Sequence, residues 1–115
     1  MAIPSGSGTE VLKHAYVNAL STTSTTILNG VANHVYTVLS IVFTEVVNGS
    51  DEKIYMEIHD SSTVLTLMKH QPVGGYQSFV WNDRLVLSGD VDLKVYTSSG
   101  AEVDVWLSYI DQDWT

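Results

Sequence analysis

Four histidines are the side chains of this sequence most able to bind a metal: His14, His34, His59 and His70. None of them stands in a ligand spacing such as HxH or HExxH, and each lies beside ordinary strand or turn residues. Such surroundings favour histidines that face solvent or the rim of a sheet. We therefore predict no metal site.

Closely spaced acids are the other candidates for chemistry. Asp51 and Glu52 fall in a predicted turn, and Asp111 and Asp113 lie near the end of the chain, where a positioned acid–base dyad is not expected. Segment 88–92, SGDVD, has only part of a calcium-loop pattern, and its first acid is better explained as a turn residue. Motifs of the GxSxG, Walker and GxGxxG types do not occur. These observations predict a protein that is not an enzyme and holds no cofactor.

Length and composition indicate one small domain. The chain has 115 residues and no cysteine, so disulfides, thiolate ligands and thiol redox chemistry are excluded. The start of the chain lacks a basic segment followed by an apolar one, which argues against a secretory signal. The longest apolar run, residues 35–47, is too short for a membrane span and contains Thr37, Ser40, Thr44 and Glu45. We expect a soluble protein with no membrane partner.

The charge is strongly acidic, with thirteen acids against five bases and a net charge of −8. The basic residues are isolated from one another, so no basic stripe is available for a phosphate backbone. Nucleic acid is therefore not an expected partner. An acidic surface favours solubility and would also suit a basic protein surface or a cation.

Alternation of apolar and polar residues is clearest in the last quarter of the chain. It runs through residues 91–97 and again through 101–110, on either side of a Ser-Ser-Gly turn. A period of two is typical of a strand with one face on a core. Two such strands joined by a short turn predict an antiparallel hairpin.

The rest of the chain repeats this pattern of short strands and turns. Counting them gives seven to nine strands and no convincing helix. The sequence thus predicts an all-β fold, a single antiparallel β-sandwich of the jelly-roll kind formed by residues 9–115. Residues 1–8, rich in Gly and Ser, are expected to form a flexible extended N-terminal arm.

Apolar residues without an obvious place in one core suggest contact with other protein. Strand 35–47 is apolar on both faces, so its outer face needs a cover. Tyr55, Tyr96 and Trp106 fall on the outward register of their strands, where aromatic side chains favour protein contacts. The alternatives are a register wrong by one residue or a loop that crosses over these rings. Trp81 is expected in the core or at a sheet end. The candidate interface residues are Ile3, Pro4, Val11, Leu12, Val38, Val42, Tyr55, Tyr96, Trp106 and Trp114.

Several segments resemble small virion structural proteins of tailed bacteriophages. They are KHAYV at 13–17, the run 22–28, YTVLSI at 36–41, LVLSGD at 85–90 and VDVWLSY at 103–109. The resemblance touches most of the chain and implies a non-enzymatic role as a capsid decoration (cement) protein, or as a neck, tail or fibre component. The sequence departs from that pattern by having two residues, Val91 and Asp92, before Leu93 where one is expected. Trp106 and the acidic segment 111–114 are also not part of that pattern. The resemblance therefore leaves open where on the particle the protein would bind.

The same resemblance implies partners. A decoration protein would form a homo-oligomer, which we expect to be a trimer. Its arm, from Ile3 to Leu12, would dock on the major capsid protein or on a neighbouring copy. Its location would be the virion, assembled in the cytoplasm of a bacterial host. The alternative is a carbohydrate-binding or receptor-binding sandwich on a fibre, in which the outward aromatic rings would stack on sugars.

Overall fold

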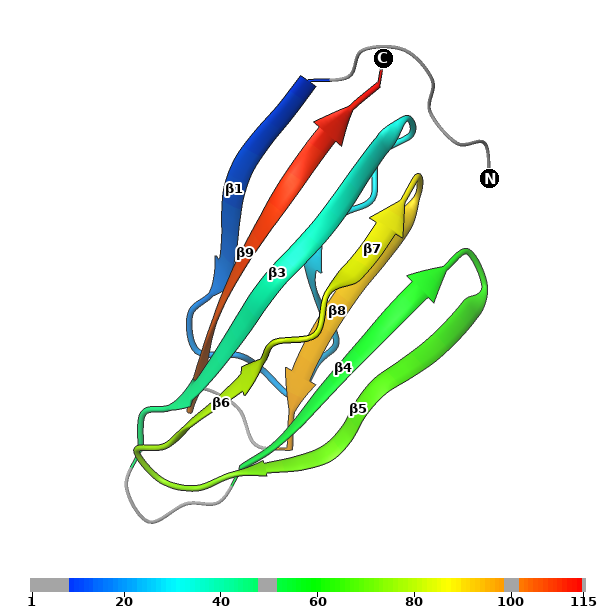
Figure 1. The fold of residues 1–115 in the computed structure, drawn as a ribbon. Helices are drawn as coiled ribbons and strands as arrows, with labels where there is room; N and C mark the ends of the chain where they lie inside the picture. The colour runs from blue at the N-terminus through cyan, green and yellow to red at the C-terminus, as the bar shows by residue number, and fades with distance from the viewer. Residues whose placement is uncertain (1–8, 48–51, 99–101, 115) are drawn as a thin grey trace.

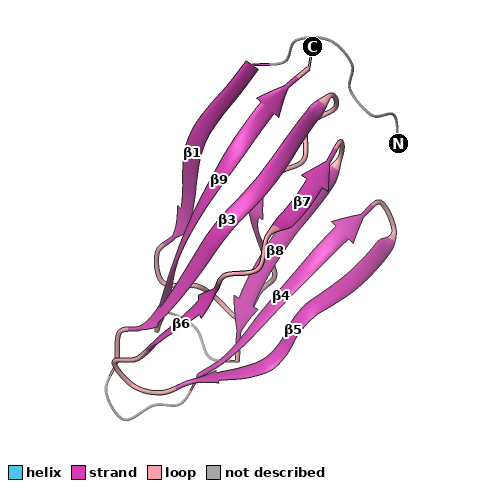
Figure 2. Ribbon diagram, viewed as in Figure 1, coloured by secondary structure: helices cyan, strands magenta, loops and turns pink. Residues whose placement is uncertain are grey.

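The computed structural model describes residues 9–47, 52–98 and 102–114, and in these ranges every regular element is a strand (Figure 2). The strands are β1 (Thr9–Val17), β2 (Thr25–Leu28), β3 (His34–Glu45), β4 (Glu52–Asp60), β5 (Thr63–Val73), β6 (Ser78–Trp81), β7 (Leu85–Ser88), β8 (Val91–Thr97) and β9 (Val103–Asp113). The prediction of an all-β fold is confirmed. Nowhere in the described part of the chain is there a helix with the length and apolar character needed to span a bilayer.

The strands form two antiparallel sheets that pack face to face (Figure 1). One has the order β1-β9-β3-β6, with β7 also paired to β3, and the other has the order β2-β8-β4-β5. If β6 and β7 are counted as one interrupted strand, the chain changes sheet at every connection except the one from β4 to β5. Repeated crossing between two sheets of this order is the arrangement of a jelly roll.

The hairpin predicted near the end of the chain is wrong. Strands β8 and β9 both exist, but β8 pairs with β2 and β4, whereas β9 pairs with β1 and β3 in the other sheet. Alternation shows that each strand has a core-facing side, yet it carries no information about which strand lies beside it. Leu93 of β8 and Leu107 of β9 instead face the common core from opposite sheets, and both are fully buried.

The apparent two-faced character of β3 arises from a β-bulge. Its register with β9 shifts at Leu39, so one extra residue enters the strand there. Tyr36 and Val38 before the bulge, and Ile41 and Phe43 after it, consequently face the same core although they do not share one period of two. Val38, which the sequence places among the candidate interface residues, is therefore a core residue with an exposed fraction of 0%.

The core between the sheets is a continuous apolar cluster centred on Phe43, Ile41 and Leu107. Leu20, in the connection from β1 to β2, closes it and is fully buried, with its backbone N–H donating to the carbonyl oxygen of Val103 at 2.7 Å. Burying a side chain of this size contributes about 1.5–3 kcal/mol. Trp81 packs against this cluster from β6, as expected.

Candidate interaction surface

The outer face of the β1-β9-β3-β6 sheet carries a row of apolar side chains that crosses four strands. Tyr16 of β1 lies directly opposite Trp106 of β9, which lies opposite Val42 of β3, which in turn lies opposite Val80 of β6. Trp106 is flanked in its own strand by the buried Val105 and points away from the core. We call Tyr16, Trp106, Val42 and Val80 the aromatic–valine row.

This row is open to solvent in the monomer. The exposed fractions of Tyr16, Trp106 and Val80 are 64%, 48% and 46%. The ring of Trp106 is stacked with that of His14, with centroids 4.4 Å apart, and with that of Tyr16 at 5.9 Å. Cross-strand aromatic pairs of this kind stabilise the sheet and limit the side-chain conformations of their members.

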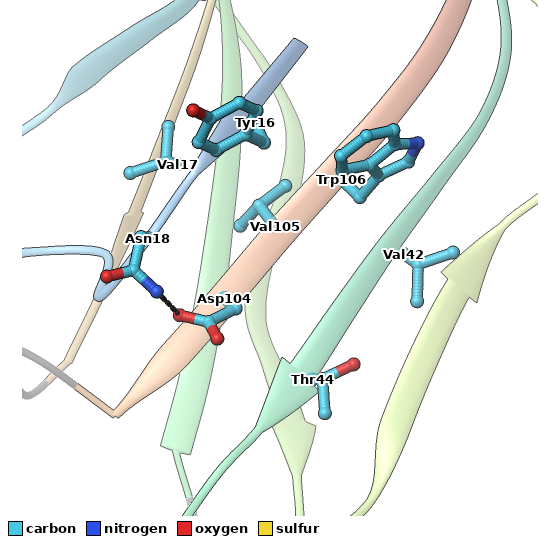
Figure 3. Close-up of a pocket in the computed structure, with 8 residues that line it drawn as sticks. All are labelled: Tyr16, Val17, Asn18, Val42, Thr44, Asp104, Val105 and Trp106. Atoms are coloured by element: carbon cyan, nitrogen blue, oxygen red, sulfur yellow. Dashed lines mark hydrogen bonds between the residues drawn. The ribbon is translucent and has the colours of Figure 1, made fainter. Parts of the chain in front are cut away.

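A hollow of about 350 Å³ lies along this row (Figure 3). It is lined by Tyr16, Val17, Asn18, Val42, Thr44, Asp104, Val105 and Trp106. Its polar edge is fixed by Asp104, whose carboxylate accepts hydrogen bonds from the Asn18 side-chain amide at 3.0 Å and from the Ala19 backbone N–H at 2.8 Å. An aromatic wall with one anchored carboxylate can receive an apolar side chain that carries a polar tip.

A second hollow, of about 540 Å³, lies on another side of Trp106. It is lined by Leu12, Lys13, His14, Leu39, Ser40, Trp106 and Ser108. Leu12 is 72% exposed, and its neighbour Val11 is 45% exposed, because β1 is the edge strand of its sheet. Both are candidate interface residues, but only Leu12 lines the same hollow as Trp106, whereas Val11 does not.

The outer face of the other sheet has its own aromatic pair. Tyr55 of β4 and Tyr96 of β8 are directly opposite, with ring centroids 4.5 Å apart and planes 2° from parallel. Burial, followed by the charge of Glu57, raises the pKa of Tyr96. The Tyr55 hydroxyl also lies 3.2 Å from Nδ1 of His70. The predicted outward register of both tyrosines agrees with these positions, and the pair is half-buried.

Asp111 lies in an ordered cluster of charges rather than in a free tail. Asp111 is 5% exposed. Its Oδ2 lies 2.8 Å from Lys13 Nζ, and its Oδ1 lies 2.8 Å from His34 Nδ1. Trp114 is also held, since its backbone N–H donates to the carbonyl oxygen of Asn33 at 2.9 Å. Ile3 and Pro4 lie outside the described residues.

Sequence reasoning missed a group of three glutamates at one end of the sandwich, Glu45, Glu52 and Glu102. Glu45 is two residues from Phe43 and Glu52 is two residues from Ile54, so both are in phase with buried side chains. A glutamate two residues from a core residue in a strand points to the same side as that residue, and this spacing is the signal that the sequence offered. Their proximity depends on the register of β3 with β9 and on the packing of the two sheets.

Comparisons with known proteins show the fold. No family model matches the chain, and no curated protein does. A chain of the T13 IBDV viral particle matches with a TM-score of 0.56 and 7% identity. The match covers 91% of the present chain but only 31% of the viral one. A protein of Bacillus endospore appendages, from a family of disulfide-linked pili, matches with a TM-score of 0.52 and 10% identity over 100% of this chain and 97% of that one. A pentameric capsid protein isolated from metagenomic phage sequences gives a TM-score of 0.45 and 20% identity over 86% of this chain and 60% of that one.

Proposed function

We propose that this chain is a non-enzymatic structural protein of a bacteriophage virion, a capsid decoration protein that acts as a homo-oligomer. The observation that carries the proposal is the aromatic–valine row, which places exposed Tyr16 and Trp106 on a rigid sheet face beside a hollow. In this proposal the aromatic–valine row binds a second copy of the chain. Residues 1–8 and the edge strand β1 bind the major capsid protein.

The row suits association because it gathers apolar area in one place. Single exposed apolar residues are normal on a soluble protein, whereas a continuous patch marks a contact surface. Trp and Tyr contribute much contact area with few rotatable bonds, so ordering them on binding loses little entropy. With a net charge of −8, the rest of the surface keeps the separate subunits soluble.

The fold is compatible with this role without specifying it. Jelly rolls form viral capsid and lectin domains among others, and one fold serves many functions. The structural likeness to a chain of a viral particle supports the virion assignment. The likeness to a pilus protein indicates another kind of assembly, but a disulfide-linked one cannot be built from this chain because it has no cysteine.

Self-association tests the role of the row. We expect the purified protein to sediment as a trimer in analytical ultracentrifugation and Trp106→Ala to sediment as a monomer with unchanged circular dichroism. Val86→Ala is the matched control, because Val86 is 66% exposed on the same sheet but lies outside the row. A monomeric wild-type protein at all concentrations, or a trimeric Trp106→Ala variant, would refute the proposal.

Particle binding tests the role of the arm. Deletion of residues 1–8 is expected to leave the domain folded and trimeric but to abolish its co-sedimentation with phage heads. Full binding by the truncated protein would remove the arm from the proposal. Binding to isolated tails and not to heads would move the protein to the neck, tail or fibre.

A second candidate function is carbohydrate binding, and the hollow beside Trp106 favours it. An aromatic ring next to the fixed carboxylate of Asp104 and the amide of Asn18 is a combination that binds sugars. Saturable binding on a glycan array, lost in both Trp106→Ala and Asp104→Ala, would support this function over decoration.

A further inference from the structure

The end of β3 and the starts of β4 and β9 lie at the same end of the sandwich (Figure 1). Three glutamates come close together there. Glu45 is the last residue of β3, Glu52 is the first residue of β4, and Glu102 immediately precedes β9. Because β3 and β9 belong to one sheet and β4 to the other, the three carboxylates bridge the two layers.

The carboxylates are close together and withdrawn from solvent. One oxygen from each lies within 4.8 Å of the others. Glu45 is 0% exposed, Glu52 is 2% exposed and Glu102 is half-buried. Buried acids are rare in proteins unless they are paired with a cation or bind a metal.

The hydrogen bonds leave part of this group without a partner. Oε1 of Glu45 accepts a hydrogen bond from the backbone N–H of Val47 at 3.0 Å, but its buried Oε2 accepts none. The buried Oε2 of Glu102 also has no partner. A buried carboxylate oxygen without a partner is costly in a folded protein, and two of them in one close group of carboxylates favour the binding of a cation there.

Electrostatics at Glu102 reflect how closely these carboxyl groups are placed. A hydrogen bond shared with Glu52 raises the pKa of the Glu102 carboxyl, and burial and the charges of Glu52 and Glu45 raise it further. No basic side chain is among the groups that act on it within the described residues. The negative charges therefore repel one another unless a cation or a proton lies between them.

We propose that Glu45, Glu52 and Glu102 form a Ca²⁺ site that ties the two sheets together at this end. Ca²⁺ takes oxygen ligands at about 2.3–2.6 Å, so two of its ligands lie at most about 5 Å apart, which fits the observed grouping. Mg²⁺ binds at about 2.0–2.1 Å and keeps most of its water, which disfavours it at a buried site. The site is separate from the aromatic–valine row and does not depend on the proposed function.

Thermal unfolding with added metal tests the site. The full-length protein, stripped with EDTA, is titrated with CaCl₂ while its melting temperature is followed, and a parallel series receives MgCl₂ at equal ionic strength. We expect Ca²⁺ to raise the melting temperature with a dissociation constant of roughly 10⁻⁴ to 10⁻³ M, as for sites with few protein ligands. We expect Mg²⁺ to give a much smaller rise.

Charge-removing variants identify the ligands. Glu45→Gln and Glu102→Gln keep the shape of the side chain and should each abolish the Ca²⁺-dependent rise. Asp60→Asn, at the exposed opposite end of β4, is the matched control and should respond as the wild type does. Two variants are used because either one alone could fold poorly.

Three results would overturn the proposal. The first is no Ca²⁺-dependent rise in the wild type, which would mean that the carboxylates share a proton instead. The second is a full rise in both glutamine variants. The third is an equal response to Mg²⁺, which would show simple screening of the acidic surface. Isothermal titration of the wild type with CaCl₂ measures the same binding without relying on unfolding.

Discussion

Lys13 Nζ lies 2.8 Å from Oδ2 of Asp111 and thereby joins the edge strand β1 to β9. The other oxygen of this carboxylate lies 2.8 Å from His34 Nδ1 on β3, so one acid bonds to both neighbouring strands. Burial by itself would raise the pKa of Asp111, but the hydrogen bonds and charges of Lys13 and His34 outweigh it and hold the pKa below its usual value. The carboxylate form therefore stabilises the fold.

Asp111→Asn is expected to lower the free energy of unfolding by about 1–2 kcal/mol near neutral pH, a value reduced by the partial exposure of Lys13. The folded-state pKa of Asp111 is lower than its ordinary value of 3.8. Its contribution is therefore fully present above that pH and is lost as the pH falls through the folded-state value. Urea unfolding of both proteins across the acid range measures the difference.

The control for this change is Glu10→Gln, which also removes a carboxylate. Glu10 is an exposed residue of β1, and its carboxylate accepts a hydrogen bond from the Gln112 side-chain amide at 2.8 Å. Its stability should follow that of the wild type at every pH. If the deficit of Asp111→Asn stayed constant down to strong acid, lost packing rather than lost charge would be its cause.

Gly30 lies where the chain turns from β2 toward β3, and its environment leaves no room for a side chain. A Cβ at this position would overlap backbone atoms of Gly89 and Val91, which cannot move without disturbing the start of β8. Gly30→Ala should therefore lower stability by about 1–3 kcal/mol. Gly74→Ala is the control, because its Cβ would meet only the movable end of the Gln77 side chain. Equal midpoints for the two variants in urea would contradict this explanation.

Much of the strand content could be predicted from the sequence because burial imposes a period of two. Segment 91–97 coincides with β8, whose inward Leu93 and Val95 alternate with polar residues. Pairing could not be predicted in the same way, since the alternation of β8 is equally consistent with a hairpin or with a place in the opposite sheet. The sheet order is decided by contacts between segments far apart in the chain.

The candidate surface was predictable only in part for the same reason. The outward position of Trp106 follows from the alternation of its own strand. Its alignment with Tyr16 and Val80 depends on three strand registers, and a short sequence pattern does not encode them. The meeting of Glu45 with Glu102 across β3 and β9 is likewise a product of register and sheet packing.

The stacked pair Tyr55 and Tyr96 should prove energetically coupled. In a double-mutant cycle with Tyr55→Ala and Tyr96→Ala, we expect a coupling free energy of about 0.5–1 kcal/mol, the range for cross-strand aromatic pairs. Tyr55→Ala combined with Val86→Ala is the control, because Val86 lies on the other sheet, and those effects should add. Additive losses for the tyrosine pair would mean that the rings serve a partner rather than the sheet.

The β-bulge of β3 can be tested by deleting single residues from the strand. Leu39 is the extra residue, so deleting it restores one period of two in which Val38 and Ile41 still face the core. Leu39 deletion should therefore leave a cooperatively folding protein. Deleting Val42 should lower the free energy of unfolding by at least about 2 kcal/mol more than deleting Leu39 does. Without Val42, Phe43 follows Ile41 directly, so keeping Phe43 in the core turns Ile41 out of it and Ser40 into it. Urea unfolding followed by circular dichroism ranks the two deletions, and greater damage from loss of Leu39 would show that the bulge itself holds the fold.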